Sequence, residues 1–176
     1  MSTNIWRDIE PGTKEAITTI VEINKGSKNK YEIDKKTGLI ALDRVLHTSQ
    51  DYPFDYGFVP QTLWEDGDPL DVVILTTYPL FPGCLLTVRP VAVLSMVDSG
   101  ESDAKIIAVP TEDPRFNIIK DLKDINPHTL KEIEHFFLTY KKLQNKTVEL
   151  HGYSDKAAAE VAFEKSIKAY ADTYSK

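Results

Sequence analysis

The alternation of apolar and polar residues predicts most of the strands of this chain. The β-branched segment 16–23 is typical of a strand. In segment 30–34 charged residues alternate with apolar ones, and segment 39–45 follows a turn at 35–38. This pattern predicts a β-hairpin whose charged side chains share one face. The apolar runs at 72–75, 85–97 and 104–109 predict further, more buried strands.

The segments between these strands carry turn residues. A Pro-Gly turn at 11–12 ends an N-terminal arm, and Pro90 predicts a bend or an edge within the long apolar run. Segment 51–60 has too many Pro, Gly and aromatic residues for a regular element, so we expect an ordered loop packed by its own rings. Segment 98–103 predicts a loop between two strands, and segment 110–123 is irregular.

Helical spacing begins near the C-terminal end of the sequence. Asn126 suits the N-cap of a helix and Pro127 its first position. A short strand at 147–150 is expected to end in a turn at 151–152, and Ser154 to cap a second helix. The apolar stripes of the two helices comprise Leu130, Ile133, Phe136, Phe137 and Tyr140, and Ala159, Phe163, Ile167, Tyr170 and Tyr174.

Strands that precede two helices predict a small antiparallel β-barrel or curled sheet with the helices packed against it. A length of 176 residues fits a single domain with a sizeable core, and no repeat or linker divides the sequence. We therefore expect one domain over residues 1–176. Its parts are an N-terminal arm (1–14), a barrel with its loops (15–124) and a helical C-terminal part (125–176).

Composition narrows the class of protein. A net charge of -6 argues against general nucleic-acid binding, because phosphate backbones select basic surfaces. The first residues lack a basic segment followed by an apolar one, and no apolar run approaches the roughly 20 residues that a membrane span needs. The single cysteine, Cys84, has no partner for an internal disulfide. We expect a cytoplasmic protein that binds neither membrane nor nucleic acid.

The strongest chemical signal is an acidic stretch directly before the first apolar run. Asp66, Asp68 and Asp71 lie within six residues, beside a Gly and a Pro. Two carboxylates about 4 Å apart repel by roughly 4 kcal/mol near a protein surface, so a positive partner is expected. An acidic turn is the simpler interpretation of one Asp, but three beside a buried strand favour a divalent-metal site. An EF-hand is excluded, because Asp71 and Thr77 stand where that loop needs Gly and Glu.

A second acidic pair, Asp98 and Asp103, brackets the predicted loop between two strands. In an antiparallel hairpin these residues would face each other across the loop, with Lys105 on the same side of its strand. A solvated turn is the alternative interpretation of this pair. Cations and phenols on other predicted elements, such as Lys30 and Tyr56, complete a mixture that suits a polyphosphate held by Mg²⁺, Lys, Arg and Tyr.

Other site motifs are absent from the sequence. Its histidines are dispersed, so a zinc site built on a histidine or cysteine cluster is not expected. No GxxxxGK(S/T), GxGxxG or GxSxG motif occurs, which excludes P-loop NTPases, dinucleotide-binding enzymes and the nucleophile elbow of hydrolases.

Together these motifs resemble those of the soluble family I inorganic pyrophosphatases of the prokaryotic type. The acidic stretch 66–72, Asp-Gly-Asp-Pro-Leu-Asp-Val, is the most specific part of the resemblance. The other blocks stand in the order that the family has, between about residue 21 and about residue 143. They are Lys30 to Glu32, Asp43-Arg44, Tyr52 to Phe58, Arg89 to Val91, Asp98 to Lys105 and His135 to Lys141.

The resemblance implies a β-rich mixed fold: a five-stranded OB-like antiparallel β-barrel with two main C-terminal helices packed against it. It also implies Mg²⁺-dependent hydrolysis of pyrophosphate to two phosphates, which drives biosynthetic reactions that release pyrophosphate. Several Mg²⁺ ions per site are implied, with Mn²⁺ or Zn²⁺ as substitutes and Ca²⁺ as an inhibitor. The implied assembly is a homohexamer.

The resemblance also implies roles for individual residues. Asp68 would be the catalytic base, and Glu22 and Tyr52 would be supporting members of the site. The metal ligands would be Asp66, Asp71, Asp98, Asp103 and Glu32. The residues that bind substrate or product phosphate would be Lys30, Arg44, Tyr56, Lys105, Tyr140 and Lys141. No role is carried onto Arg115 or Lys120, because their segment varies among relatives.

Two other functions fit parts of the pattern. A metal-dependent hydrolase of nucleotides or longer polyphosphates would share the acidic site, but the sequence shows no specific sign of a base-binding pocket. A non-catalytic OB-type binding module would share the barrel, but the acidic charge opposes oligonucleotide binding. For the favoured function we expect direct in-line attack of a metal-activated water, without a covalent enzyme intermediate.

Overall fold

A ring of five strands forms the centre of the computed structural model, which describes residues 3–174. In spatial order the ring contains β2 (Ala16–Ile23), β5 (Asp55–Phe58), β6 (Asp71–Ile74), β8 (Glu101–Pro110) and β7 (Leu85–Asp98). Pairing of β7 with β2 closes the ring. Its neighbours are antiparallel except β6 and β8, which are parallel. The predicted β-rich fold with a five-stranded barrel is confirmed, and one of its pairings is parallel.

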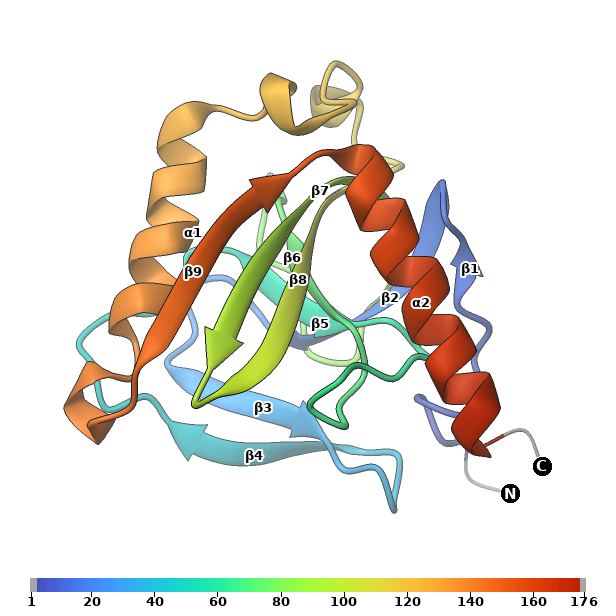
Figure 1. Ribbon diagram of the computed structural model, residues 1–176, viewed down its shortest axis with the longest axis horizontal. Coiled ribbons are helices and arrows are strands. Elements are labelled where there is room, and N and C mark those ends of the chain that lie inside the picture. Colours follow the sequence, from blue (N-terminus) through green and yellow to red (C-terminus); the bar gives the residue numbers. More distant parts are fainter. Residues whose placement is uncertain (1–2, 175–176) are drawn as a thin grey trace.

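Shorter elements extend this ring (Figure 1). β1 (Gly12–Thr13), within the predicted N-terminal arm, pairs with β2, and β9 (Val148–Ser154) pairs with β7. β3 (Asn29–Ile33) and β4 (Ile40–Val45) form a separate two-stranded sheet, as predicted. Residues 1 and 2 of the arm lie outside the described part of the chain.

Two α-helices flank the barrel on different sides (Figure 1). α1 (Pro127–Thr139) lies beside β9, and α2 (Lys156–Tyr174) packs against β7. Asn126 caps α1 as predicted, because its side chain accepts a hydrogen bond from the backbone N–H of His128 at 2.8 Å. Three short 3-10 helices also occur: η1 (Pro114–Phe116), η2 (Leu122–Asp124) and η3 (Lys142–Gln144).

The apolar faces of the two helices meet different parts of the ring. Phe136 and Phe137 of α1 are buried against an aromatic cluster, with the ring of Phe136 centred 4.7 Å from that of Tyr52. On the other side, Ala159 and Phe163 of α2 join a cluster formed by residues of β2, β6, β7 and β8. Burial of Phe136 and Phe137 holds the end of α1 close to the barrel.

The expectation that segment 51–60 is a loop throughout is wrong at its centre. Residues Asp55–Phe58 form β5, a fully buried strand between β2 and β6. The Gly in this strand permits close approach of its neighbour: a Cβ on Gly57 would lie 2.1 Å from the carbonyl oxygen of Ile20. A residue that suggested a loop in the sequence is therefore required by strand packing.

Two turn predictions are also wrong. The loop expected at 98–103 is a two-residue turn, because Asp98 pairs directly with Glu101, and both Ser99 (φ 53°) and Gly100 (φ 91°) have positive φ. Asp103 is therefore opposite Met96 and diagonal to Asp98, on the same face of the hairpin.

Near the second helix, β9 continues through the turn expected at 151–152. The pairing shifts there, so that Gly152 is opposite Ser95 but Leu150 is opposite Met96, and His151 is the extra residue of a bulge. The cap predicted at Ser154 is wrong by one residue. Asp155 accepts a hydrogen bond from the backbone N–H of Ala158 at 3.1 Å.

Candidate active site

A cavity of about 660 Å³ opens between the barrel and the β3–β4 hairpin. Every residue to which the sequence resemblance gave a role lines this cavity. They come from β2, β3, β4, β5, β6, β7, β8, the loops before β5 and β6, and the end of α1. Segments far apart in the sequence therefore meet at one place, as predicted for the acidic stretch and the scattered cations.

The loop before β6 turns tightly and presents two aspartates to the cavity. The backbone N–H of Trp64 donates to the carbonyl of Asp68 (2.7 Å), and that of Gly67 donates to the carbonyl of Trp64 (3.0 Å). Asp66 accepts a hydrogen bond from the backbone N–H of Asp68 at 3.0 Å. Burial and the charges of Asp71 and Asp103 nevertheless raise the pKa of Asp66 to about 6. Burial and these negative neighbours thus disfavour the charged form of Asp66.

Asp71, Asp103 and Lys105 form a triad on β6 and β8, in which Asp103 and Lys105 are buried and Asp71 is partly buried. The parallel register places Asp71 beside Lys105. Lys105 Nζ lies 2.5 Å from Asp71 Oδ2 and 2.6 Å from Asp103 Oδ1, and Lys105 is only 4% exposed. Burial lowers the pKa of Lys105, but the two carboxylates outweigh this effect and raise it well above its usual value. The lysine therefore stays charged and is shared between two acids.

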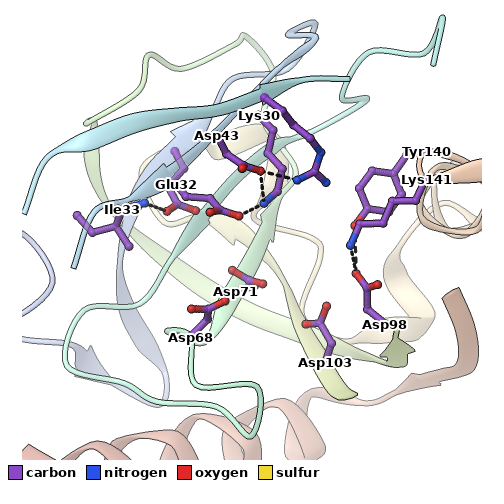
Figure 2. A network of polar contacts seen from close by, with 12 residues as sticks. Lys30, Glu32, Ile33, Asp43, Asp68, Asp71, Asp98, Asp103, Tyr140 and Lys141 are labelled. Atoms are coloured by element: carbon purple, nitrogen blue, oxygen red, sulfur yellow. Dashed lines mark hydrogen bonds and ion pairs between the residues drawn. The ribbon is translucent and has the colours of Figure 1, made fainter. Parts of the chain in front are cut away.

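The hairpin contributes the opposite wall of the cavity. Figure 2 shows Lys30 with Glu32 and Asp43 on one side, and Asp68, Asp71 and Asp103 on the other. Lys30 pairs with Glu32 and, at 3.3 Å, with Asp43, which also pairs with Arg44. Burial, assisted by the charge of Arg44, lowers the pKa of Lys30.

Glu22 on β2 fastens this hairpin to the barrel. Its carboxylate accepts a hydrogen bond from the backbone N–H of Ile33 at 2.6 Å. Glu22 is buried, and burial together with the charge of Asp71 raises its pKa to about 8. The Glu22 side chain thus supports the site by holding the hairpin in place. Like Asp66, it lies near the negative charge of Asp71.

Residues at the end of α1 close a third side of the cavity. In Figure 2, Lys141 points to Asp98 at the end of β7, and the two form an ion pair. The hydroxyl of Tyr140 lies 3.4 Å from the same carboxylate. Burial opposes ionisation of Asp98, but its ion pair with Lys141 dominates and lowers its pKa overall.

Three buried tyrosines, Tyr52, Tyr56 and Tyr140, surround the triad. Burial raises the pKa of each phenol above its usual value. They stay neutral at physiological pH, so their hydroxyl groups can donate hydrogen bonds to an anion. Lys105 Nζ also lies 5.4 Å from the centre of the Tyr56 ring, which adds a cation–π contact.

The donor set of the cavity fits a hard divalent cation, because carboxylate oxygens are the ligands that Mg²⁺ prefers. Burial and neighbouring carboxylates raise the pKa values of Asp66 and Glu22, and a cation bound beside them would favour their ionised forms. Within residues 3–174, however, no three His, Cys, Asp or Glu side chains gather as a metal-binding group. In this structure lysines form ion pairs with Asp68, Asp71, Asp98 and Asp103.

Two of the charged residues that sequence reasoning did not assign to this site form ion pairs with assigned ones. Asp43 links Lys30 to Arg44, and Lys35 pairs with Asp68 from the turn of the hairpin. Asp43 belongs to a sequence block that carries the resemblance, so that block contained a signal for it. Lys35 stands in a polar turn beside Lys36, a pattern typical of a solvated loop, and only the folded chain shows its partner.

Comparison with known proteins gives a consistent result over nearly the whole chain. The family profile described as "Inorganic pyrophosphatase" matches residues 19–171. An inorganic pyrophosphatase of Haloferax volcanii is 49% identical over 175 residues, which are 98% of this chain and 99% of that protein. Soluble inorganic pyrophosphatase 1 of Arabidopsis thaliana is 47% identical over 95% of this chain and 80% of that protein. The crystal structure of an inorganic pyrophosphatase from Thermus thermophilus superposes with a TM-score of 0.91 at 44% identity, covering 96% and 99% of the two chains.

Proposed function

The chain belongs to the soluble family I inorganic pyrophosphatases, and from this membership we propose how its own residues divide the work of hydrolysing pyrophosphate. As a member of this metal-dependent family it is an inorganic diphosphatase, EC 3.6.1.1. The observation that supports the division is the cavity itself, where carboxylates, cations and phenols from the barrel, the hairpin and the end of α1 meet.

Asp66, Asp71 and Asp103 are the principal ligands for Mg²⁺ in this proposal, with Asp98 and Glu32 holding further ions. Bound there, Mg²⁺ would supply a water of lowered pKa and positive charge opposite the phosphates. Because Lys105 shares Asp71 and Asp103, its ammonium must give up at least part of these contacts when the carboxylates turn to a metal. The released ammonium is then available to a phosphate oxygen.

Asp68 takes the proton from the attacking water. It lies between two proposed ligands in the sequence, and more than half of its side chain is exposed to the cavity and solvent. An ordinary carboxylate, with a pKa of about 3.9, is a weak base toward free water. It becomes effective toward a water whose pKa is already lowered. The water then attacks one phosphorus in line, and no enzyme side chain forms a covalent intermediate.

The cations and phenols bind the two phosphates. Lys30, Arg44 and Lys105 supply positive charge. Tyr56 on β5 and, at the end of α1, Tyr140 and Lys141 supply further hydrogen-bond donors. These groups neutralise the charge that develops on the leaving phosphate. Glu22 and Tyr52 support the site, since Glu22 fastens the hairpin and Tyr52 packs against the ring of Tyr56.

The cellular context is part of the proposal. We place the protein in the cytoplasm as a homohexamer of single-domain subunits, where removal of pyrophosphate drives reactions that release it. No helix in residues 3–174 is long and apolar enough to cross a membrane. Pyrophosphate and phosphate are its small-molecule partners, Mn²⁺ or Zn²⁺ are substitutes for Mg²⁺, and Ca²⁺ inhibits because its coordination is larger and looser.

Phosphate release from pyrophosphate, with Mg²⁺ and with a chelator, tests this function. We expect rapid release with Mg²⁺, almost none with the chelator, and little release from ATP or tripolyphosphate under the same conditions. Equal or faster release from ATP would contradict the substrate assignment and favour the nucleotide or polyphosphate hydrolase. Replacing Mg²⁺ by Mn²⁺, Zn²⁺ or Ca²⁺ in the same assay tests the choice of metal.

A further inference from the structure

The turn between β3 and β4 brings Lys35 onto the acidic loop. Its Nζ donates to the carbonyl oxygen of Gly67 at 2.8 Å and forms an ion pair with Asp68. The same ammonium lies 5.9 Å from the centre of the buried Trp6 ring. These contacts place a positive charge between the N-terminal arm and the turn that carries Asp68.

The backbone that carries Lys35 is itself held in place. Asp34 accepts hydrogen bonds from the backbone N–H groups of Lys36 (3.1 Å) and Thr37 (2.6 Å), which closes the hairpin turn. Asn4 of the N-terminal arm donates to the carbonyl oxygen of Lys35 at 3.3 Å. The lysine therefore reaches Asp68 from a fixed support, even though 38% of its side chain is exposed.

The other side of the acidic loop is held by α2. Lys165 pairs with Glu65 and lies 4.8 Å from the centre of the Trp64 ring. The backbone N–H of Leu63 donates to the carbonyl of Ser166 at 3.0 Å. These contacts fix the loop but do not touch Asp68. Among the residues that the structure describes, Lys35 is the cation paired with the Asp68 carboxylate.

We propose that Lys35 is a positioning residue for Asp68. The proposal rests on the function proposed above for Asp68 as the base. The Asp68 side chain is 58% exposed, and its hydrogen bond within residues 3–174 comes from Lys35. Without this partner the carboxylate would sample several rotamers, and fewer of them would face the attacking water. Lys35 acts on turnover through Asp68 and does not itself bind the phosphates.

Four variants test this proposal in steady-state pyrophosphate hydrolysis with Mg²⁺. Lys35→Met keeps the length of the side chain and removes its charge, and Lys35→Arg restores a cation. Lys165→Met is the matched control, because it removes a lysine from the other side of the same loop. Lys35→Met is also combined with Asp68→Asn. Thermal unfolding of each variant confirms that it is folded at the assay temperature.

We expect Lys35→Met to lower kcat about two- to fivefold, the range that a half-exposed ion pair supports, with KM for pyrophosphate nearly unchanged. Lys35→Arg should recover most of the lost kcat, and Lys165→Met should keep the wild-type kcat. In the Asp68→Asn background, Lys35→Met should have no further effect, because the residue that it positions is already disabled.

Three results would overturn the proposal. They are an unchanged kcat in Lys35→Met, a raised KM with unchanged kcat, and an equal loss of kcat in the Asp68→Asn background. The second would make Lys35 a substrate contact. If Asp68→Asn alone kept near-wild-type turnover, the function proposed for Asp68 would fail and the role of Lys35 would fail with it. A low kcat in Asp68→Asn with a normal kcat in Lys35→Met would reject only the role of Lys35.

Discussion

Lys105 Nζ lies 2.5 Å from Asp71 Oδ2, in a place where both groups are largely shielded from water. The contact follows from the one parallel pairing of the ring, which sets these two residues side by side on β6 and β8. Asp103 shares the same ammonium at 2.6 Å. The lysine thus compensates the charge of both carboxylates, and if these bind Mg²⁺ as proposed, metal and lysine must compete for the same oxygens.

Lys105→Met should make the fold depend on metal. Without metal, the variant leaves the buried Asp103 and the partly buried Asp71 unpaired, and we expect a loss of about 3 kcal/mol in the free energy of unfolding. Mg²⁺ bound to Asp71 and Asp103 should recover most of this loss, so the variant gains more stability from Mg²⁺ than the wild type does. Urea unfolding in chelator and in Mg²⁺ measures the difference.

Lys156→Met is the control for this experiment, since it removes a more exposed ion pair with Glu160 on α2. We expect at most about 1 kcal/mol of lost stability there, equal in chelator and in Mg²⁺. If Lys105→Met lost the same free energy of unfolding in chelator and in Mg²⁺, Asp71 and Asp103 would not bind the metal when the lysine is removed.

Asp68→Asn should separate proton transfer from metal binding. The amide keeps the shape of the carboxylate but cannot accept the proton from water, so we expect kcat to fall by about 10²–10⁴-fold. The affinity for Mg²⁺ without substrate should stay close to that of the wild type, because Asp68 is not a proposed ligand. Steady-state kinetics and calorimetric Mg²⁺ titration report the two quantities. A turnover near normal would remove Asp68 from the role of base.

Asp71→Ala should show the reverse pattern. Loss of a proposed ligand weakens metal affinity first, so activity at low Mg²⁺ should fall steeply and partly return when Mg²⁺ is in large excess. The Mg²⁺ concentration for half-maximal rate measures this shift. An unchanged Mg²⁺ dependence, whatever the loss of rate, would count against Asp71 as a ligand.

Local signals in the sequence predicted the elements whose physics is local. β2 has the bounds predicted from its β-branched residues, and α1 starts at the predicted Asn-Pro cap. The acidic stretch was also recognisable from local sequence, because neighbouring carboxylates repel each other and therefore indicate a positive partner. The features that could not be predicted from the sequence depend on contacts between distant segments. β5 was missed because its aromatic residues and Gly57 resemble a loop until β2 packs against them.

The same distinction applies to the site. The diagonal placement of Asp98 and Asp103 depends on a two-residue turn that local charge cannot indicate. The pairing of Lys35 with Asp68 joins residues 33 positions apart and depends on how the hairpin folds over the barrel. Elementary chemistry identified the kinds of residue that the cavity needs. The fold decided which lysine meets which carboxylate.

Gly57→Ala tests the explanation of β5. The new methyl group would lie 2.1 Å from the carbonyl oxygen of Ile20 and 2.8 Å from its carbon, so β2 and β5 must move apart. We expect a loss of about 3 kcal/mol or more in the free energy of unfolding. Gly26→Ala is the control: its φ is +86°, but nothing lies within 4 Å, so only backbone strain of about 1–2 kcal/mol is expected. Equal losses in the two variants would contradict the packing explanation.

Asp121 lies away from the cavity and should make the stability of the fold depend on pH in the acid range. Its carboxylate accepts hydrogen bonds from the backbone N–H groups of Lys156 (3.1 Å) and Leu122 (2.7 Å), which joins η2 to the start of α2. These bonds hold the pKa of Asp121 below its usual value. The folded state therefore favours the ionised form, so the contribution of Asp121 to stability is complete above the unfolded pKa of about 3.9. It is lost as pH falls through the lower, folded pKa.

Asp121→Ala should consequently unfold at a lower temperature than the wild type at pH 7, by an amount that stays nearly constant down to about pH 5. Below about pH 4 the difference should narrow, because the wild type then loses the same interaction by protonation. Asp121→Asn retains an acceptor oxygen, so we expect it to lower the unfolding temperature less than Asp121→Ala does. Its difference from the wild type should not narrow at low pH in the same way. Thermal unfolding followed by circular dichroism across this pH range measures all three proteins. A gap between wild type and Asp121→Ala that is as wide at pH 3 as at pH 7 would show that the charge of Asp121 contributes nothing to its bonds with Lys156 and Leu122.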